Sequence, residues 1–120
     1  MYTYSFEKLD VWQLARRFTT EIYPLTKGFP KEEIFGITNQ IRRACVSICS
    51  NIAEGVSRQT NKEKARFIQI SYGSAVEVLN QLIISNDLKY ISKEELQTLR
   101  VKIEEITNKL NALHRSQLNK

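Results

Sequence analysis

Two cysteines and one histidine are the side chains of this sequence best suited to metal or nucleophilic chemistry. Cys45 and Cys49 are four residues apart in a predicted helix, and His114 lies far along the chain. Two thiolates supply only half of a tetrahedral zinc site, and this spacing on one helix suits a disulfide poorly. We therefore interpret both cysteines as small buried apolar residues, and we expect neither a metal nor a cofactor.

No group of residues in the sequence matches a common catalytic motif. The strings GxxxxGK[ST], GxGxxG, HExxH and GxSxG are absent, and so is the Glu-x-x-His signature of di-iron bundles. His114 has no carboxylate or nucleophile pattern beside it. Its predicted place in the last turn of a helix favours a cation for electrostatic reasons alone. We expect that the protein is not an enzyme.

Basic residues form modest clusters that could contact phosphate groups. The sequence has 18 Lys and Arg against 13 Asp and Glu, a formal net charge of +5, spread along the chain. A solvated helical face explains each cluster taken alone. In a symmetric oligomer, however, the charge multiplies and attracts phosphate backbones without reading base sequence. The predicted nucleic-acid contacts are Arg16, Arg17, Arg42, Arg58, Lys62 and Lys64.

The composition predicts a single helical domain spanning residues 1–120. The chain is 42% hydrophobic and 26% charged, as in globular proteins, and its 4 Gly and 2 Pro are too few for an all-β fold with many tight turns. No apolar run approaches the roughly 18–20 residues of a membrane span. Because the start of the sequence lacks the pattern of a signal peptide, we expect a cytoplasmic protein that does not contact a membrane.

Apolar residues recur at helical spacing in four segments. Ser92 with Glu95, and Thr60 with Glu63, have the spacing of capping boxes just before the last two of them. The predicted helices are about 8–24, 37–56, 61–88 and 93–117.

Two residues indicate where the first two helices end. Pro24 should end or kink the first helix near Tyr23, and Gly55 is a natural C-terminal residue for the second. Since the connections are short, the expected fold is all-α, an antiparallel up-down-up-down four-helix bundle.

The second and third helices carry few charges for an isolated bundle. Part of the third helix is also apolar outside its core stripe, at Phe67, Ile70, Val78 and Ile84. A wide core stripe explains some of these residues, and the remainder predict a homo-oligomer interface on the two helices. The charged residues are Arg42, Arg43 and Glu54 within 34–57, and Arg66 and Glu77 within 65–86.

Most of these charges are placed so that they could pair between the helices. In an antiparallel hairpin centred near Thr60, residues whose numbers add to 120 lie at the same height, so Glu54 would meet Arg66 and Arg43 would meet Glu77. We interpret them as a buried polar seam that fixes the hairpin register, in preference to a catalytic or ligand-binding role. Its predicted members are Arg43, Asn51, Glu54, Arg66 and Glu77.

Several strings of residues resemble one known family, the four-helix-bundle 23S ribosomal RNA intervening-sequence proteins. The strings are Leu9-Asp10-Val11-Trp12, Phe29-Pro30 with Glu33, Gln40-Ile41-Arg42-Arg43-Ala44, Ser47-Ile48 with Asn51-Ile52-Ala53-Glu54-Gly55, and Gly73-Ser74 with Glu77-Val78-Leu79. The resemblance covers nearly the whole chain, with Cys49 where proline is often seen. It implies a bacterial bundle that assembles as a homopentamer. A similar bundle is the accessory variability determinant of diversity-generating retroelements, which binds nucleic acid and a reverse transcriptase.

These observations predict a non-enzymatic homo-oligomer, pentameric by the resemblance, whose basic surface binds structured RNA or DNA in connection with ribosomal RNA intervening sequences. The alternative is an interaction scaffold that presents an apolar or charged face to a protein partner and binds no nucleic acid. A binding titration across salt concentrations separates the two, because phosphate binding weakens steeply as salt rises.

Overall fold

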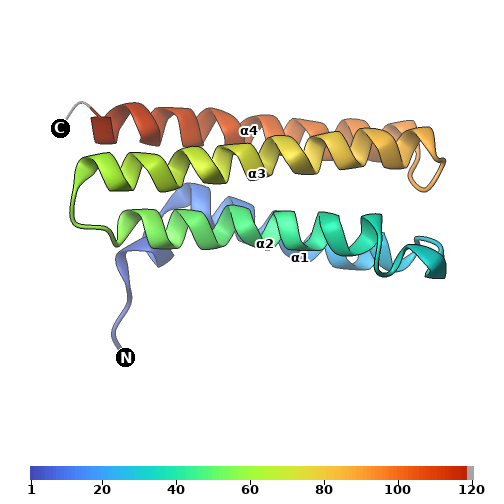
Figure 1. Cartoon of the computed structure of the whole chain (residues 1–120), viewed down its shortest axis with the longest axis horizontal. Helices are drawn as coiled ribbons and strands as arrows, with labels where there is room; N and C mark the ends of the chain where they lie inside the picture. The colour runs from blue at the N-terminus through green and yellow to red at the C-terminus, as the bar shows by residue number, and fades with distance from the viewer. Residues whose placement is uncertain (119–120) are drawn as a thin grey trace.

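The computed structural model describes residues 1–118, and all its regular elements in that range are helical. The four long helices are α1 (Asp10–Lys27), α2 (Ile37–Val56), α3 (Asn61–Asp87) and α4 (Lys93–Leu118), with short 3-10 helices η1 (Ser5–Lys8) and η2 (Lys31–Glu33). Successive long helices run in opposite directions in an elongated bundle of 45 × 30 × 20 Å (Figure 1). The predicted all-α, up-down-up-down bundle is confirmed. Within residues 1–118, no helix has the length and apolar character to cross a membrane.

The first helix continues past Pro24, so the predicted end near residue 24 is wrong. Pro24 cannot donate a hydrogen bond to the carbonyl of Thr20, but Thr20 is exposed and water can replace that donor. Side chains hold the next turn in place. Thr26 Oγ1 donates to the Ile22 carbonyl at 2.8 Å, and Arg42 of α2 donates to the Tyr23 carbonyl at 3.3 Å.

The two predicted helix caps are present, one fully and one in part. Ser92 Oγ accepts from the amide of Glu95 at 3.0 Å, and the Glu95 carboxylate accepts from the amide of Ser92 at 2.9 Å. Thr60 Oγ1 accepts from the amide of Glu63 at 3.2 Å, whereas the Glu63 carboxylate pairs with Arg66 at 3.1 Å. Reciprocal capping therefore fixes the start of α4, and a single cap fixes the start of α3.

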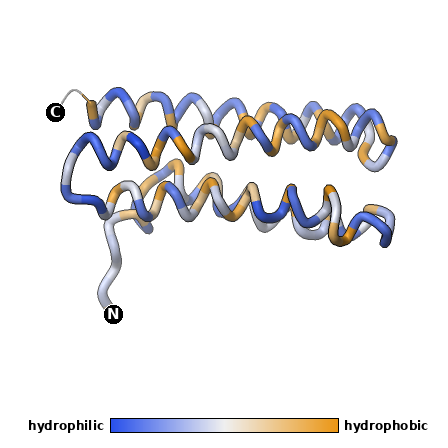
Figure 2. The backbone as a smooth tube through the Cα atoms, in the orientation of Figure 1, coloured by the Kyte–Doolittle hydropathy of each residue, from blue (hydrophilic) through white to orange (hydrophobic). Residues whose placement is uncertain are grey.

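Apolar side chains from all four helices meet in one core. Hydrophobic and hydrophilic segments alternate along each helix at helical spacing (Figure 2), as the sequence pattern predicts. Val11, Ala15, Phe18 and Ile22 of α1 are all buried, as expected. The largest fully buried apolar side chains elsewhere are Ile41, Ile48, Ile52, Ile68, Val78, Leu82, Ile103, Ile106 and Leu110.

Small residues bring α2 and α3 close together at the predicted register. Ser47 Oγ lies 2.9 Å from Ser74 Oγ, and Ser71 Oγ donates to the Ile48 carbonyl at 2.8 Å, so facing residue numbers add to 121 and 119. At Gly55 a Cβ would lie 3.0 Å from Phe67 Cβ. Since α2 continues to Val56, Gly55 serves close packing rather than helix termination.

The ion pairs predicted between α2 and α3 do not form within the chain. Glu54 pairs with Arg58 of the same chain segment, at 3.3 Å, and not with Arg66. Arg43 and Glu77 are exposed, and neither has an ion-pair partner among residues 1–118. These charges lie on the outward flank of the hairpin, where they stay hydrated and avoid the cost of burial.

The polar contacts between α2 and α3 therefore come from uncharged side chains. Of the five predicted seam residues, only Asn51 reaches these contacts, and it does so within α2: its amide donates to the Ser47 carbonyl at 2.9 Å and to Ser47 Oγ at 3.0 Å. A serine hydroxyl needs only one or two partners, so it is satisfied between packed helices more readily than a charge.

Candidate nucleic-acid interface

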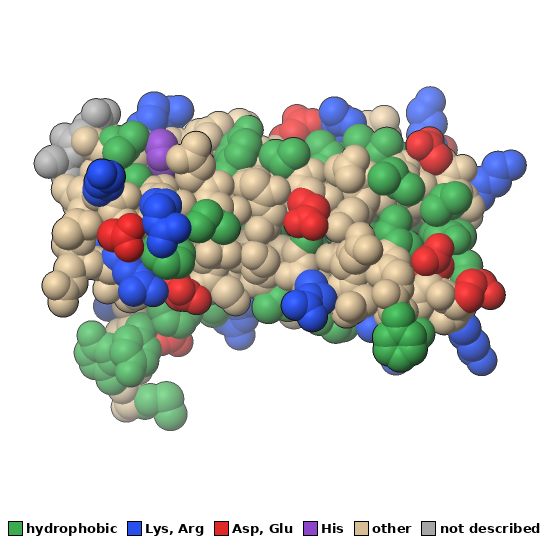
Figure 3. All heavy atoms as spheres, in the orientation of Figure 1, with side chains coloured by type: hydrophobic (Ala, Val, Ile, Leu, Met, Phe, Trp, Pro, Cys, Tyr) green, Lys and Arg blue, Asp and Glu red, His purple; other side chains and the backbone are tan. Residues whose placement is uncertain are grey.

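Four basic residues gather at the end of the bundle where α2 joins α3. This basic end consists of Arg58, Lys62, Lys64 and Arg66, against the two acidic residues Glu54 and Glu63 of the same segment. The connections at the opposite end, residues 27–33 and 87–95, carry four basic residues against five acidic ones. Figure 3 shows Lys and Arg side chains gathered at the α2–α3 end with acidic side chains among them, and both kinds of charge at the other end. Positive charge is therefore concentrated at one end of the long axis.

The two arginines of the basic end are held over one aromatic ring. Arg58 Cζ lies 4.6 Å and Arg66 Cζ 4.9 Å from the centroid of the Phe67 ring. Each guanidinium also pairs with a neighbouring carboxylate, yet their side chains remain 43% and 59% exposed. The stacking limits side-chain motion while leaving N–H groups free to donate to a phosphate.

The two lysines occupy the first turn of α3. Lys62 is exposed and Lys64 is half-buried. Because backbone N–H groups at a helix start attract negative charge, this turn adds to the field of the lysines. Three of the six predicted contacts, Arg58, Lys62 and Lys64, thus lie together.

The other three predicted contacts lie elsewhere on the bundle. Arg16 and Arg17 are exposed on α1, and Arg16 Cζ lies 5.3 Å from the Trp12 ring centroid. Arg42 is half-buried near the opposite end: its Nε donates to Thr26 Oγ1 at 2.9 Å, and its guanidinium lies 4.6 Å from the Tyr23 ring. Arg42 therefore joins α2 to the end of α1 and is separate from the basic end.

A series of aromatic side chains near the N-terminus escaped the sequence analysis. Tyr2, Tyr4, Phe6 and Trp12 follow one another with ring centroids 4.9, 6.3 and 5.0 Å apart. The segment that carries the outer rings of this N-terminal aromatic series extends below the α2–α3 end of the bundle (Figure 1), whereas Trp12 belongs to α1 and is half-buried. The signal in the sequence is the alternation of aromatic residues at positions 2, 4 and 6.

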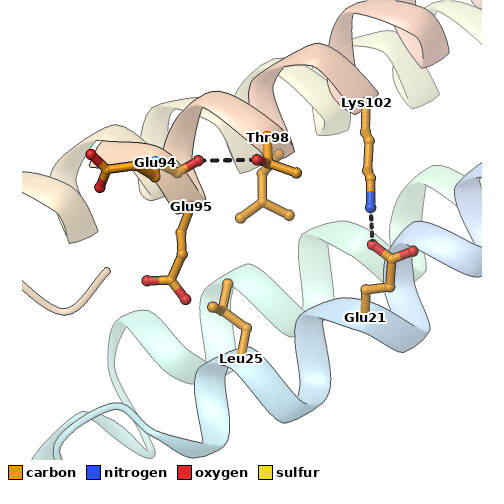
Figure 4. A pocket seen from close by; sticks show the side chains of 7 residues that line it. Glu21, Leu25, Glu94, Glu95, Thr98 and Lys102 are labelled. Carbon is orange, nitrogen blue, oxygen red and sulfur yellow. Dashed lines mark hydrogen bonds and ion pairs between the residues drawn. The ribbon is translucent and has the colours of Figure 1, made fainter. Parts of the chain in front are cut away.

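A hollow of about 320 Å³ between α1 and α4 has the opposite electrostatic character. Lys102 pairs with Glu21 across it, and Leu25 and Thr98 form part of its wall (Figure 4). Its other lining residues include the carboxylates Glu94 and Glu95. With three carboxylates and one paired lysine, this hollow repels a polyanion.

The two cysteines and the histidine are buried or half-buried. Burial, together with the neighbouring Cys49 thiol, raises the pKa of Cys45 to about 12. Burial also raises the pKa of Cys49, whose Sγ lies 3.6 Å from Thr19 Oγ1. Both thiols are free, and His114 is half-buried beside Tyr72. Within residues 1–118 no three His, Cys, Asp or Glu side chains are grouped to hold a metal ion.

Comparison with known proteins identifies the family. The model of the 23S rRNA-intervening sequence protein family matches residues 7–112. The chain belongs to this family. Membership in the 23S rRNA-intervening sequence proteins confirms the resemblance seen in the strings between residues 9 and 79.

A solved structure supports the fold of this family member. It is a protein of unknown function from the S23 ribosomal protein family of Bacteroides thetaiotaomicron VPI-5482, which superposes with a TM-score of 0.80 at 24% identity. The match covers 87% of this chain and 97% of that chain. No curated protein matches the chain.

Proposed function

We propose that this intervening-sequence family protein is a non-enzymatic homo-oligomer that binds structured RNA or DNA, in connection with ribosomal RNA intervening sequences. The observation that carries the proposal is the basic end. Arg58 and Arg66 are stacked on Phe67 and remain exposed, and Lys62 lies beside them in the first turn of α3.

The side chains of the basic end are better suited to the phosphates of a nucleic acid than to the carboxylates of a protein partner. Guanidinium groups donate two parallel hydrogen bonds to phosphate oxygens, and lysines add hydrated point charges. Contacts of this kind orient a protein on a nucleic acid without specifying base sequence. Helical stems of structured RNA present their phosphates in this way.

The outward face of α2 and α3 supports self-association. Apolar side chains there stay partly exposed: Val46 at 43%, Ile70 at 41% and Val76 at 48%. The middle of this face has few charged side chains (Figure 3), and Gly73 has open space in front of it. Such a surface favours contact with another copy, and the family resemblance suggests five copies.

Assembly would increase the effect of the basic end. If copies associate side by side around a cyclic axis parallel to their helices, every basic end lies on the same rim. The rim would then present one set of Arg58, Lys62, Lys64 and Arg66 for each subunit. A closed ring of positive charge is a strong attractor of phosphate backbones.

A salt titration tests the nucleic-acid part of the proposal. We expect the wild-type protein to bind a labelled RNA hairpin. The logarithm of its affinity should fall linearly with the logarithm of the salt concentration between about 50 and about 200 mM. Fluorescence anisotropy measures it. Absence of binding at the lowest salt concentration would overturn this part and leave the protein-interaction scaffold as the function to pursue.

Light scattering tests the oligomeric part. At micromolar concentration we expect a single mass that is a multiple of the 14.0 kDa chain. Substituting Ile70 and Val76 by glutamine should shift the mass toward the monomer, because both side chains are exposed in the subunit. A sharp monomeric mass of the wild-type protein would contradict the assembly.

A further inference from the structure

A hollow between the N-terminal segment and the last turn of α2 has the composition of a nucleobase site. Its volume is about 280 Å³, which is ample for one base ring. The lining residues are Tyr4, Ser5, Phe6, Ala53, Glu54 and Ser57. Aromatic rings, a carboxylate and hydroxyls thus surround one small concave space.

We propose that this hollow binds an unpaired nucleobase of the RNA or DNA strand whose phosphates contact the basic end. The inference rests on the proposed function and defines its substrate further, as unpaired segments rather than uninterrupted duplex. Arg58 connects the two sites, because its guanidinium lies 3.3 Å from the Glu54 carboxylate that lines the hollow.

The aromatic wall supplies stacking surface that the fold does not use. Tyr4 and Phe6 have ring planes within 13° of each other, with centroids 6.3 Å apart. Tyr4 is 60% exposed and Tyr2 is 75% exposed, and no residue of η1 is buried. Since Tyr2 and Tyr4 contribute little to the core, their rings are available to unstacked bases.

The inner end of the aromatic series is fixed, which orients the outer rings. Phe6 packs edge-on against Trp12 with centroids 5.0 Å apart, and Arg16 Cζ lies over Trp12 at 5.3 Å. The Tyr4 amide donates to the Glu7 carboxylate at 2.8 Å, which holds the segment at the start of η1. Single-strand binding surfaces combine stacking rings with nearby arginines, which are here Arg16 over Trp12 and Arg58 beside Glu54.

The polar groups of the hollow favour bases that carry an amino group. The Glu54 carboxylate is 54% exposed and can only accept hydrogen bonds when ionised. Ser57 Oγ donates to the Glu54 carbonyl at 2.7 Å, so its free lone pairs also act as acceptors. Cytosine offers an N4 amino donor, whereas uracil has a carbonyl at that position. Cytosine should therefore bind more tightly than uracil, a base of the same size.

Three probes test the site on the full chain: oligocytidine and oligouridine of about 12 nucleotides, and an RNA duplex of the same length. We expect the wild-type protein to prefer oligocytidine to oligouridine. Tyr4→Ala should weaken oligocytidine binding by about fivefold or more, because one stacking partner is lost. The same variant should leave duplex binding and the salt dependence unchanged. Glu54→Gln should narrow the preference for cytosine.

Two control variants separate stacking from general damage. Tyr4→Phe keeps the ring and should bind as the wild type. Phe35→Ala removes a 91% exposed ring at the other end of the bundle and should also have no effect. Circular dichroism of each variant checks that it is folded. Emission of Trp12, the single tryptophan, should fall when oligocytidine is added to the wild type or to Phe35→Ala, and the same fall should need an oligocytidine concentration about fivefold or more higher in Tyr4→Ala.

The outcomes separate failure of the nucleobase site from failure of the proposed function. If Tyr4→Ala binds oligocytidine as tightly as the wild type while duplex binding persists, the nucleobase site is wrong and the proposed function stands. If the wild type binds none of the three probes, the proposed function itself fails. Equal affinity of the wild type for oligocytidine and oligouridine would contradict the role assigned to Glu54.

Discussion

Gly55 and Gly73 form a matched pair of glycines whose replacement by alanine should have opposite effects on stability. At Gly55 a Cβ would lie 3.0 Å from Phe67 Cβ, 3.2 Å from Ile68 Cδ1 and 3.3 Å from the Lys64 carbonyl. Overpacking of this kind costs about 1–3 kcal/mol, against a gain of about 0.5–1 kcal/mol in helix propensity. At Gly73 nothing lies within 4 Å of the added methyl, so only the gain remains. We expect Gly55→Ala to lower the free energy of unfolding and Gly73→Ala to raise it.

Urea denaturation at one fixed protein concentration measures the difference, since an oligomer's stability depends on concentration. The two variants should differ by about 1–3 kcal/mol, with unchanged denaturant slopes. Equal stabilisation by both substitutions would refute the close approach of α2 and α3 at Gly55. If Gly73→Ala has a lower oligomeric mass than the wild type, the interface between copies lies at that face. The two free energies of unfolding would then be compared at a protein concentration where both variants are monomeric.

Three further outcomes follow from individual side chains. Cys45, whose pKa is about 12, should resist alkylation at pH 8 until the protein unfolds, as mass spectrometry can show; rapid native labelling would contradict its burial. Arg42→Ala should destabilise the protein by about 1–2 kcal/mol in urea denaturation through loss of the bond to Thr26, without weakening RNA binding; a purely RNA-binding defect would reverse this assignment. The hydrogen bond and charge of Lys109 lower the pKa of Asp10 below its ordinary 3.8, so their stabilising effect is present above that pH and is lost as pH falls. The melting temperatures of wild type and Asp10→Asn should accordingly differ at neutral pH and converge in acid; a constant gap would contradict the pairing.

Apolar periodicity predicted the four helices, and the position of the connection near Thr60 predicted the register of α2 against α3. The residues of α2 match the predicted range 37–56, and the contact of Ser47 with Ser74 falls one residue from the expected register. The first follows from the spacing of the apolar residues, and the second from the short connection between two antiparallel helices. Pro24 shows the limit of such local rules, because contacts from Arg42 hold a helical turn that the proline alone would disfavour.

The prediction of a charged seam failed because the spacing of residues shows which of them share a helix face. It does not show whether the edge of that face points toward the neighbouring helix or toward solvent. Arg43 and Glu54 share a face, but that face points outward, and Glu54 finds a partner four residues along the chain. Burial of an ion pair between helices is unfavourable when a hydrated alternative exists.

The hollow between the N-terminal segment and the last turn of α2 could not be predicted from sequence patterns either. Tyr4 and Phe6 precede the first long helix, where no helical period indicates what their side chains contact. Only the fold brings them against Ala53 and Glu54 at the end of α2. By contrast, Arg58, Lys62 and Lys64 were predicted together because they are close in the sequence.

The central claim is that nucleic acid binds at the basic end, and a comparison of two charge-matched variants tests it most directly. Lys62→Gln/Lys64→Gln removes two positive charges there, and Lys27→Gln/Lys31→Gln removes two from the opposite end. For an RNA hairpin, we expect the first variant to lower the slope of log affinity against log salt by up to about 1.8, and the second to leave it unchanged. Equal losses in both variants, or a loss only in the second, would contradict the account.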